Sequence, residues 1–164
     1  MNIKLIFTGQ TDIDYIKNAI QEYVKRLHHY VNISIVIINP PKFNSKVPLS
    51  EIKFREGELI LKHIVKEKEI NGKGIKIILL DEKGTEFRSV EFASFIQKQM
   101  NMSLKSLIFI IGGAYGFSPQ VYEMIQDRIS ISKMTFSHQL IRILLLEQIY
   151  RAFTIIKNEP YHNE

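Results

Sequence analysis

Cysteine is absent from this chain of 164 residues. Its absence excludes disulfide bonds, thiolate catalysis and thiolate metal sites together, and it fits a protein of the reducing cytosol. Histidine is present, but no two histidines have the spacing of a zinc motif such as H-E-x-x-H. We therefore expect no metal site among the five: His28, His29, His63, His138 and His162.

The sequence also shows no secretory signal peptide and no membrane-spanning segment. The first residues, MNIKLIFTG, lack a long apolar segment and a cleavage site, and they have the composition of a β-strand. The most apolar later segment, LIRILLLEQIYRAFTII, is interrupted by Arg142, Glu147 and Arg151, which argues against a membrane span. We expect a cytoplasmic protein without membrane contact.

Charge is not concentrated anywhere along the chain. The net charge is +5, but no run of lysine or arginine and no basic tail carries it. The excess is compatible with an anionic partner such as RNA and does not identify one. No internal repeat is visible, and the length suits one domain over residues 1–164.

Five apolar runs have the composition of buried strands. Two of them, GIKIILLD and SLIFIIGG, are almost continuously apolar, which is typical of strands covered on both faces of a parallel sheet. Helical patterns alternate with the runs, so the sequence predicts an α/β domain with a mostly parallel sheet and helices on both faces. The expected strands are residues 2–9, 32–39, 74–81, 106–113 and 128–132.

Four helices are expected around these strands. An apolar stripe runs along residues 11–28, and Ser50 is placed to cap a helix over 51–69. Ser118 followed by Pro119 favours the start of a short helix that ends at about 127. The last helix is expected over 136–157, and the Pro-rich segment 40–50 is expected to be an exposed loop.

Three glycines follow the fourth strand in the sequence IGGAYGFSP, residues 111–119. The order is not G-x-G-x-x-G and no Gly-Lys-Ser follows, so a dinucleotide site is weakly supported and a P-loop is excluded. Two interpretations remain, a tight turn or a ligand site at the carboxyl end of a sheet strand. LLDEKG and ISKMTF end two other strands, so three loops can meet at one edge and hold a ligand by its base, sugar or apolar parts.

His138 and Arg142 lie four residues apart on the apolar face of the last expected helix, opposite a polar stripe of Glu147, Arg151 and Thr154. A buried arginine requires a partner. That partner is either a carboxylate elsewhere in the fold or an anionic or carbonyl-rich substrate beside the glycine loop. The helix is apolar around most of its circumference, which favours a subunit interface.

Several long motifs resemble one known family. The sequences IGGAYGFS, ISISKMTFSHQLIRILLLEQIYRAFTII and PYHNE closely resemble the ribosomal RNA large subunit methyltransferase H family, the pseudouridine N3-methyltransferases of the SPOUT class. KLIFTG, REGELIL and LLDEKG also match in position, so the resemblance spans the whole chain. It implies an α/β fold with a C-terminal trefoil knot, a homodimer, and S-adenosylmethionine bound at the knot.

The resemblance also implies a substrate and a set of site residues. The family substrate is a pseudouridine in a hairpin of 23S rRNA, methylated at N3 on assembled ribosomes, and no metal is required. The implied cofactor-binding positions are Leu80, Gly112, Ile131, Ser132, Lys133, Met134, Thr135 and Phe136. The positions implied near the target base are His138, Arg142, Tyr161 and His162, followed by Asn163 where the family usually has a basic residue.

The implied reaction requires removal of a proton from the base. N3 of pseudouridine must lose its proton before it can attack a sulfonium methyl group in line. His138, His162 or solvent can accept that proton, and Arg142 can favour the deprotonated base by facing a carbonyl oxygen. Two other functions stay open: a non-catalytic ribosome- or RNA-binding module, and an α/β domain that binds a flavin or another small molecule.

Overall fold

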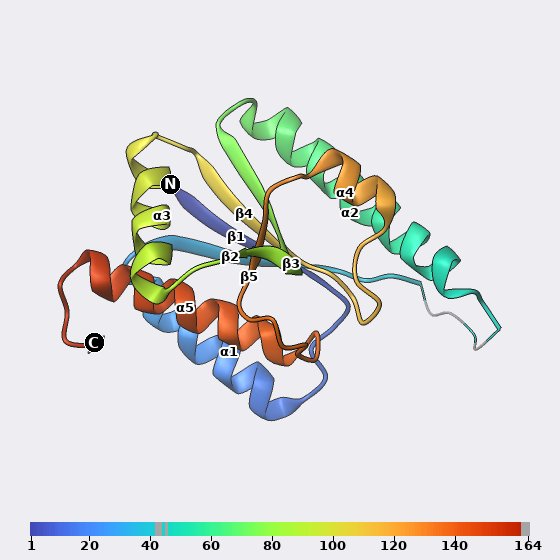
Figure 1. Ribbon diagram of the computed structural model, residues 1–164, viewed down its shortest axis with the longest axis horizontal. Helices are drawn as coiled ribbons and strands as arrows, with labels where there is room; N and C mark the ends of the chain where they lie inside the picture. The colour runs from blue at the N-terminus through green and yellow to red at the C-terminus, as the bar shows by residue number, and fades with distance from the viewer. Residues whose placement is uncertain (42–43, 45, 162–164) are drawn as a thin grey trace.

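The computed structural model describes residues 1–41, 44 and 46–161, and its strands form one parallel sheet between two helical layers (Figure 1). The strand order is β2-β1-β4-β3-β5, and every neighbouring pair is parallel. The expected α/β class with helices on both faces is therefore confirmed. The strands are β1 (Asn2–Thr8), β2 (Asn32–Ile38), β3 (Ile75–Glu86), β4 (Ser106–Ile111) and β5 (Arg128–Ser130).

The helices divide between the two faces. One face carries α1 (Asp14–Leu27), α3 (Ser89–Asn101) and α5 (Leu140–Ile156), and the other carries α2 (Leu49–Asn71) and α4 (Pro119–Met124). The helix α3 was not among the four expected from the sequence. Within the described part of the chain, no helix has the length and apolar character needed to cross a membrane.

Two helix starts differ from expectation. Ser50 lies inside α2 and does not cap it, because the carbonyl of Pro48 already accepts hydrogen bonds from the N–H groups of Glu51 and Ile52. The helix α5 begins at Leu140 and not at residue 136. The chain before it turns around Ser137, whose hydroxyl accepts a hydrogen bond from the Leu140 N–H at 3.2 Å. His138 consequently lies in the loop that leads into α5.

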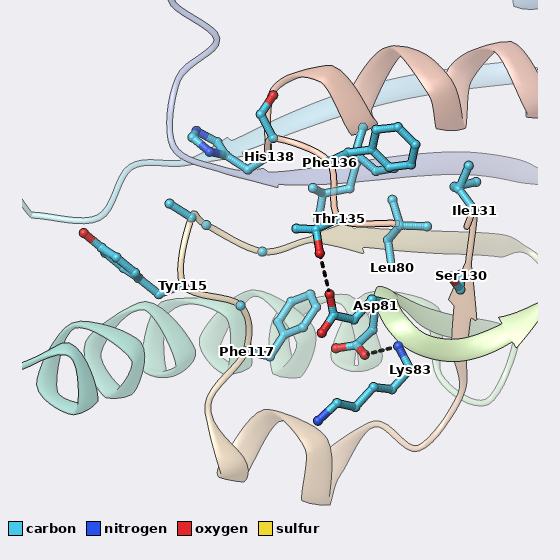
Figure 2. A pocket seen from close by; sticks show the side chains of 18 of the residues that line it. Leu80, Asp81, Lys83, Tyr115, Phe117, Ser130, Ile131, Thr135, Phe136 and His138 are labelled. Atoms are coloured by element: carbon cyan, nitrogen blue, oxygen red, sulfur yellow. Dashed lines mark hydrogen bonds between the residues drawn. The ribbon is translucent and has the colours of Figure 1, made fainter. Parts of the chain in front are cut away.

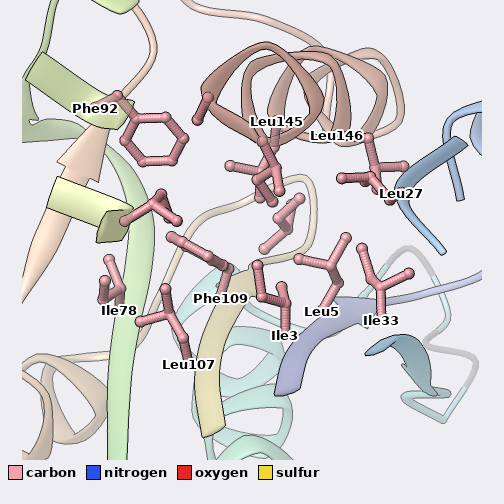
Figure 3. Packing of buried hydrophobic residues seen from close by; sticks show 14 of the residues in the cluster. Ile3, Leu5, Leu27, Ile33, Ile78, Phe92, Leu107, Phe109, Leu145 and Leu146 are labelled. Carbon is pink, nitrogen blue, oxygen red and sulfur yellow. The ribbon is translucent and has the colours of Figure 1, made fainter. Parts of the chain in front are cut away.

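The core has two halves because side chains alternate across each strand. In β1, Leu5 and Phe7 join the cluster under α1, α3 and α5, whereas Ile6 joins the cluster under α2 and α4. Figure 3 shows the first cluster, with Phe109 of β4 beneath Leu145 of α5. All six residues of β4 are buried, as the continuous apolar run predicted.

Neighbouring helices cover much of the apolar surface of α5 within the chain. The helix packs on the sheet between α1 and α3 (Figure 1). Glu147 and Arg151 form the expected ion pair at 2.7 Å. Thr154, expected with them on a solvated or paired stripe, is fully buried, and its hydroxyl donates to the carbonyl of Arg151 at 2.8 Å. The placement of Thr154 on a wet face was therefore wrong, since the neighbouring helices cover more of α5 than one sheet face would.

The strand β3 continues beyond its expected end at Asp81 by means of a bulge. Leu80 and Thr85 both pair with Ile129 of β5, so the residues between them are displaced from the ladder. Gly84 makes the return possible, because a Cβ there would lie 2.4 Å from the carbonyl carbon of Ile129. The bulge projects Asp81, Glu82 and Lys83 at the carboxyl edge of the sheet.

Gly84→Ala is expected to lower the free energy of unfolding by at least about 2 kcal/mol, since the added methyl group meets backbone atoms that cannot move independently. Urea denaturation followed by circular dichroism measures the change. The matched control is Gly74→Ala, whose Cβ would meet the flexible side chain of Lys105 at 3.1 Å and the Asn71 carbonyl at an ordinary 3.5 Å, and should cost below about 1 kcal/mol. Equal losses for the two variants would contradict the assigned role of Gly84.

Candidate active site

A cavity of about 630 Å³ lies at the carboxyl edge of the sheet, where the loops after β3, β4 and β5 meet (Figure 2). The loops are the bulge 80–83, the glycine loop 111–117 and the segment 130–138. Parallel strands place their carboxyl ends at one edge, which is where open α/β sheets bind ligands. The expected convergence of three strand ends is confirmed.

Most of the residues implied by the resemblance line this cavity. His138 lies at its rim, together with seven of the eight implied cofactor positions. Lys133 is exposed and does not line the cavity, and neither do Arg142 and Tyr161. His162 and Asn163 lie outside the described residues. The seven are Leu80, Gly112, Ile131, Ser132, Met134, Thr135 and Phe136.

The glycine loop presents main chain to the cavity. Gly112 is buried, and a Cβ on it would lie 3.2 Å from the Phe117 ring, so a side chain at this position would press against that ring. Gly116 has a φ of +76°, a conformation that favours glycine, and its N–H donates to the carbonyl of Gly113 at 3.2 Å. The tight turn is therefore confirmed, and it forms one wall of the cavity, while a ligand at this wall stays a prediction.

Hydrogen bonds from the β3 bulge hold the polar side of the cavity together. The hydroxyl of Tyr122 donates to Asp81 at 2.5 Å, and the other Asp81 oxygen accepts the Lys83 N–H at 2.8 Å. Burial and the hydrogen bond to Asp81 raise the pKa of Tyr122 to about 12. The Thr135 hydroxyl donates to Glu82 at 3.2 Å, which joins the bulge to the loop after β5 (Figure 2).

Arg142 is fully buried beneath the cavity rim and has neutral partners. Its guanidinium donates to the Thr11 hydroxyl at 2.6 Å and to the Thr8 carbonyl at 2.9 Å, and it lies 4.8 Å from the centre of the Phe7 ring. The expected carboxylate partner is therefore replaced by a hydroxyl and a main-chain carbonyl, while a contact with substrate stays a prediction. Burial lowers the pKa of Arg142 to about 10, so it remains charged at neutral pH.

His138 is held in its neutral form by its surroundings. Burial is the largest cause that lowers its pKa, and the positive charge of Arg142 lowers it further, while Asp12 acts in the opposite direction. A neutral imidazole at a cavity rim can accept a proton near neutral pH. The buried charge of Arg142 thus influences the cavity by lowering the pKa of His138.

Tyr161 lies along α5 and away from the cavity. Its ring packs edge-on against Tyr150 with centroids 4.9 Å apart, and the guanidinium of Arg151 lies 4.8 Å from its centre. Tyr150 is ten residues into α5, which corresponds to about 15 Å along the helix axis from its start. Within one chain, His138 and Tyr161 are therefore not brought together.

Several cavity residues were missed by the sequence reasoning. Asp81 and Glu82 could have been found, because polar residues directly after a buried strand are candidates for a site at its carboxyl end. Lys53 gives no such signal, since α2 brings it to the cavity from a distant part of the chain.

No group of three or more His, Asp or Glu side chains suited to a metal occurs in the described ranges 1–41, 44 and 46–161.

Comparison with known proteins identifies the class. A family model described as "Predicted SPOUT methyltransferase" matches residues 1–162, so the chain belongs to the SPOUT methyltransferase family. A protein of Parabacteroides distasonis named "Ribosomal RNA large subunit methyltransferase H" is 46% identical over 164 residues and 100% of both chains. Proteins of the same name from Flavobacterium psychrophilum and Christiangramia forsetii are each 46% identical and cover at least 99% of both chains.

Arg142→Met is expected to raise the pKa of His138, because it removes the second cause of the lowered value and leaves the opposing charge of Asp12 in place. NMR titration of the histidine side-chain resonances measures this pKa in both proteins. Arg26→Met is the control, since Arg26 is bonded to Glu22 on the exposed face of α1. An unchanged pKa of His138 in Arg142→Met would show that the buried charge does not act on the rim.

Proposed function

We propose that this methyltransferase transfers a methyl group from S-adenosylmethionine to N3 of a pseudouridine in a 23S rRNA hairpin on assembled ribosomes. The observation that carries the proposal is the cavity, where seven of the cofactor positions implied by the family converge from three loops. Relatives that share 46% of the sequence over the whole chain carry a ribosomal RNA methyltransferase name, which supports rRNA as the substrate class.

The cavity suits S-adenosylmethionine in size and chemistry. Its volume of about 630 Å³ lies within the range of small-molecule sites. Leu80, Ile131 and Phe136 provide apolar surface, and the bare main chain at Gly112 allows close approach. The carboxylates of Asp81 and Glu82 face a cavity that would hold a cation. The bound cofactor supplies a methyl group on a positively charged sulfur, and no phosphate-binding apparatus is needed.

His138 is the base that the geometry favours. It is at the cavity rim and neutral at neutral pH, so it can accept the N3 proton of the target base. Arg142 is buried and supports this role, because its charge adds to burial in lowering the pKa of His138. The resemblance implies that Arg142 contacts the base directly. Because Arg142 is fully buried, that contact would require the residues at the cavity rim to move apart. Lys53 and Lys83 line the cavity and provide positive charge for an RNA phosphate.

We also infer that two copies of the chain form the complete site. Tyr161 lies too far along α5 to reach the cavity of its own chain, so its proposed role near the base, with His162, requires the cavity of a second copy. Exposed apolar side chains at the cavity support such an interface, because Tyr115 is 46% and Met134 is 73% exposed. The proposal includes the trefoil knot implied by the family, a topology that is otherwise rare.

The wild-type chain is expected to bind S-adenosylmethionine and to methylate ribosomes from a strain that lacks the modification. Gly112→Val is expected to abolish both, since its side chain would displace Phe117 and enter the cavity. Calorimetry measures cofactor binding, and mass spectrometry of digested 23S rRNA measures the methyl group at N3.

The matched control for this experiment is Lys73→Ala, which alters an exposed residue before β3 that does not line the cavity and should retain cofactor affinity within about twofold. Ribosome binding by the wild type without cofactor binding would favour the non-catalytic module instead. Unchanged affinity in a folded Gly112→Val protein would place the cofactor elsewhere.

Truncation after Asn158 is expected to leave dimerisation and cofactor affinity nearly intact while removing rRNA methylation, because Glu159, Pro160 and Tyr161 do not line the cavity of their own chain. Analytical ultracentrifugation, calorimetry and the methylation assay measure the three properties. A mixed dimer of the truncated chain and a Gly112→Val chain should recover activity in one of its two sites. Full methylation by the truncated chain, or a monomeric wild type at micromolar concentration, would refute the shared site.

A further inference from the structure

We propose that Glu56 is a positioning residue of the cofactor cavity, which supports the glycine loop from behind without lining the cavity. The proposal rests on the proposed function, because it assigns this cavity to S-adenosylmethionine. Glu56 belongs to the segment REGELIL of α2 and is only 8% exposed. No role for it was expected from the sequence beyond membership of that helix.

The carboxyl group of Glu56 lies directly against the glycine loop. A Cβ on Gly113 would be 2.6 Å from one carboxyl oxygen of Glu56 and 3.0 Å from the other, so a side chain at position 113 would displace the carboxyl group. Gly113 lines the cavity and Glu56 does not. The carboxyl group therefore contacts the glycine loop on the side that faces away from the cavity, whereas the other side of the loop lines the cavity.

A second contact of the same kind lies next to the first. Ser118 follows the glycine loop and is 1% exposed, and a Cβ on the neighbouring Gly57 of α2 would lie 2.2 Å from its hydroxyl oxygen. At each contact, a glycine makes room for a polar side chain from the opposite segment. The two contacts hold α2 and the glycine loop in one register, as two interlocking pairs: Glu56 with Gly113, and Gly57 with Ser118.

Stability does not explain why these side chains are polar. One carboxyl oxygen of Glu56 and the hydroxyl of Ser118 are buried without a hydrogen-bond partner among the described residues. An unsatisfied buried polar group costs about 1–3 kcal/mol, and an apolar side chain of similar volume would avoid that cost. Such groups in a native structure require another reason, and contact with a ligand-binding wall provides it.

The direction of the pKa shift of Glu56 agrees with this position. Burial raises the pKa of the Glu56 carboxyl, with no charged group contributing to the shift. A protonated carboxyl has one O–H donor, which can be directed at a carbonyl of the glycine loop when that loop closes on a ligand. Glutamine has nearly the same shape and also supplies a donor, whereas leucine fills the space without one.

The decisive comparison is between Glu56→Gln and Glu56→Leu. We expect Glu56→Gln to bind S-adenosylmethionine within about threefold of the wild-type Kd, and Glu56→Leu to bind at least about tenfold more weakly, a difference of about 1.4 kcal/mol. Glu56→Leu should be at least as resistant to urea as the wild type, because it removes an unsatisfied polar group. Wild-type affinity in Glu56→Leu would overturn the proposal. Glu58→Leu, at an exposed position of the same helix, is the control.

A double-mutant cycle tests the contact itself. Gly113→Ala should weaken cofactor binding by about tenfold in the wild type and much less in Glu56→Ala, where the carboxyl group that it would meet is gone. Equal effects in the two backgrounds would overturn the proposed contact.

Hydrogen exchange separates this proposal from the proposed function. In the ligand-free protein, the amides of residues 112–117 should exchange faster in Glu56→Leu than in Glu56→Gln, with the rest of the sheet unchanged. Absence of cofactor binding by the wild type would refute the proposed function, whereas the exchange rates would still decide the role of Glu56. Identical exchange of the glycine loop in the two variants would show that Glu56 does not support it.

Discussion

The parallel pairing of β4 with β1 on one side and β3 on the other is the constraint on which the rest of the structure depends. Every residue of β4 is buried, so helices must cover both faces of the sheet, and each strand must return by a crossover to the same starting edge. All loops that follow the strands then leave at the opposite edge. The glycine loop, the β3 bulge and the segment before α5 meet there for that reason, although they are distant in sequence.

Close backbone packing gives this edge its shape. Gly84 lets β3 return to β5 after the bulge, which leaves Asp81 and Glu82 facing the cavity. Gly113 lets the glycine loop lie against α2. In both places a glycine, which has no side chain, lets one segment approach another closely, and at the bulge this leaves polar groups at the cavity. The shape of the cavity therefore depends on the packing behind its loops as well as on the residues that line it.

A buried positive charge joins the two ends of the chain beneath this edge. Arg142 of α5 donates to the carbonyl of Thr8, the last residue of β1, and to the hydroxyl of Thr11 in the loop after it. A cation with neutral partners is costly in a protein interior, so its retention fits a role at the site. Burial is the larger cause of the lowered pKa of His138, and the charge of Arg142 adds to it, so both favour a neutral imidazole at the cavity.

The sequence alone determined the α/β class, all five strands and the convergence of three strand ends, because apolar runs and glycines are local signals of burial and of turns. The resemblance to a family added the cofactor positions, seven of which line the cavity. Only the tertiary structure decided that Arg142 is buried with neutral partners, that Thr154 is covered by neighbouring helices, and that Tyr161 lies apart from His138. Helical spacing states which residues share a face, but what covers that face depends on contacts between segments far apart in the chain.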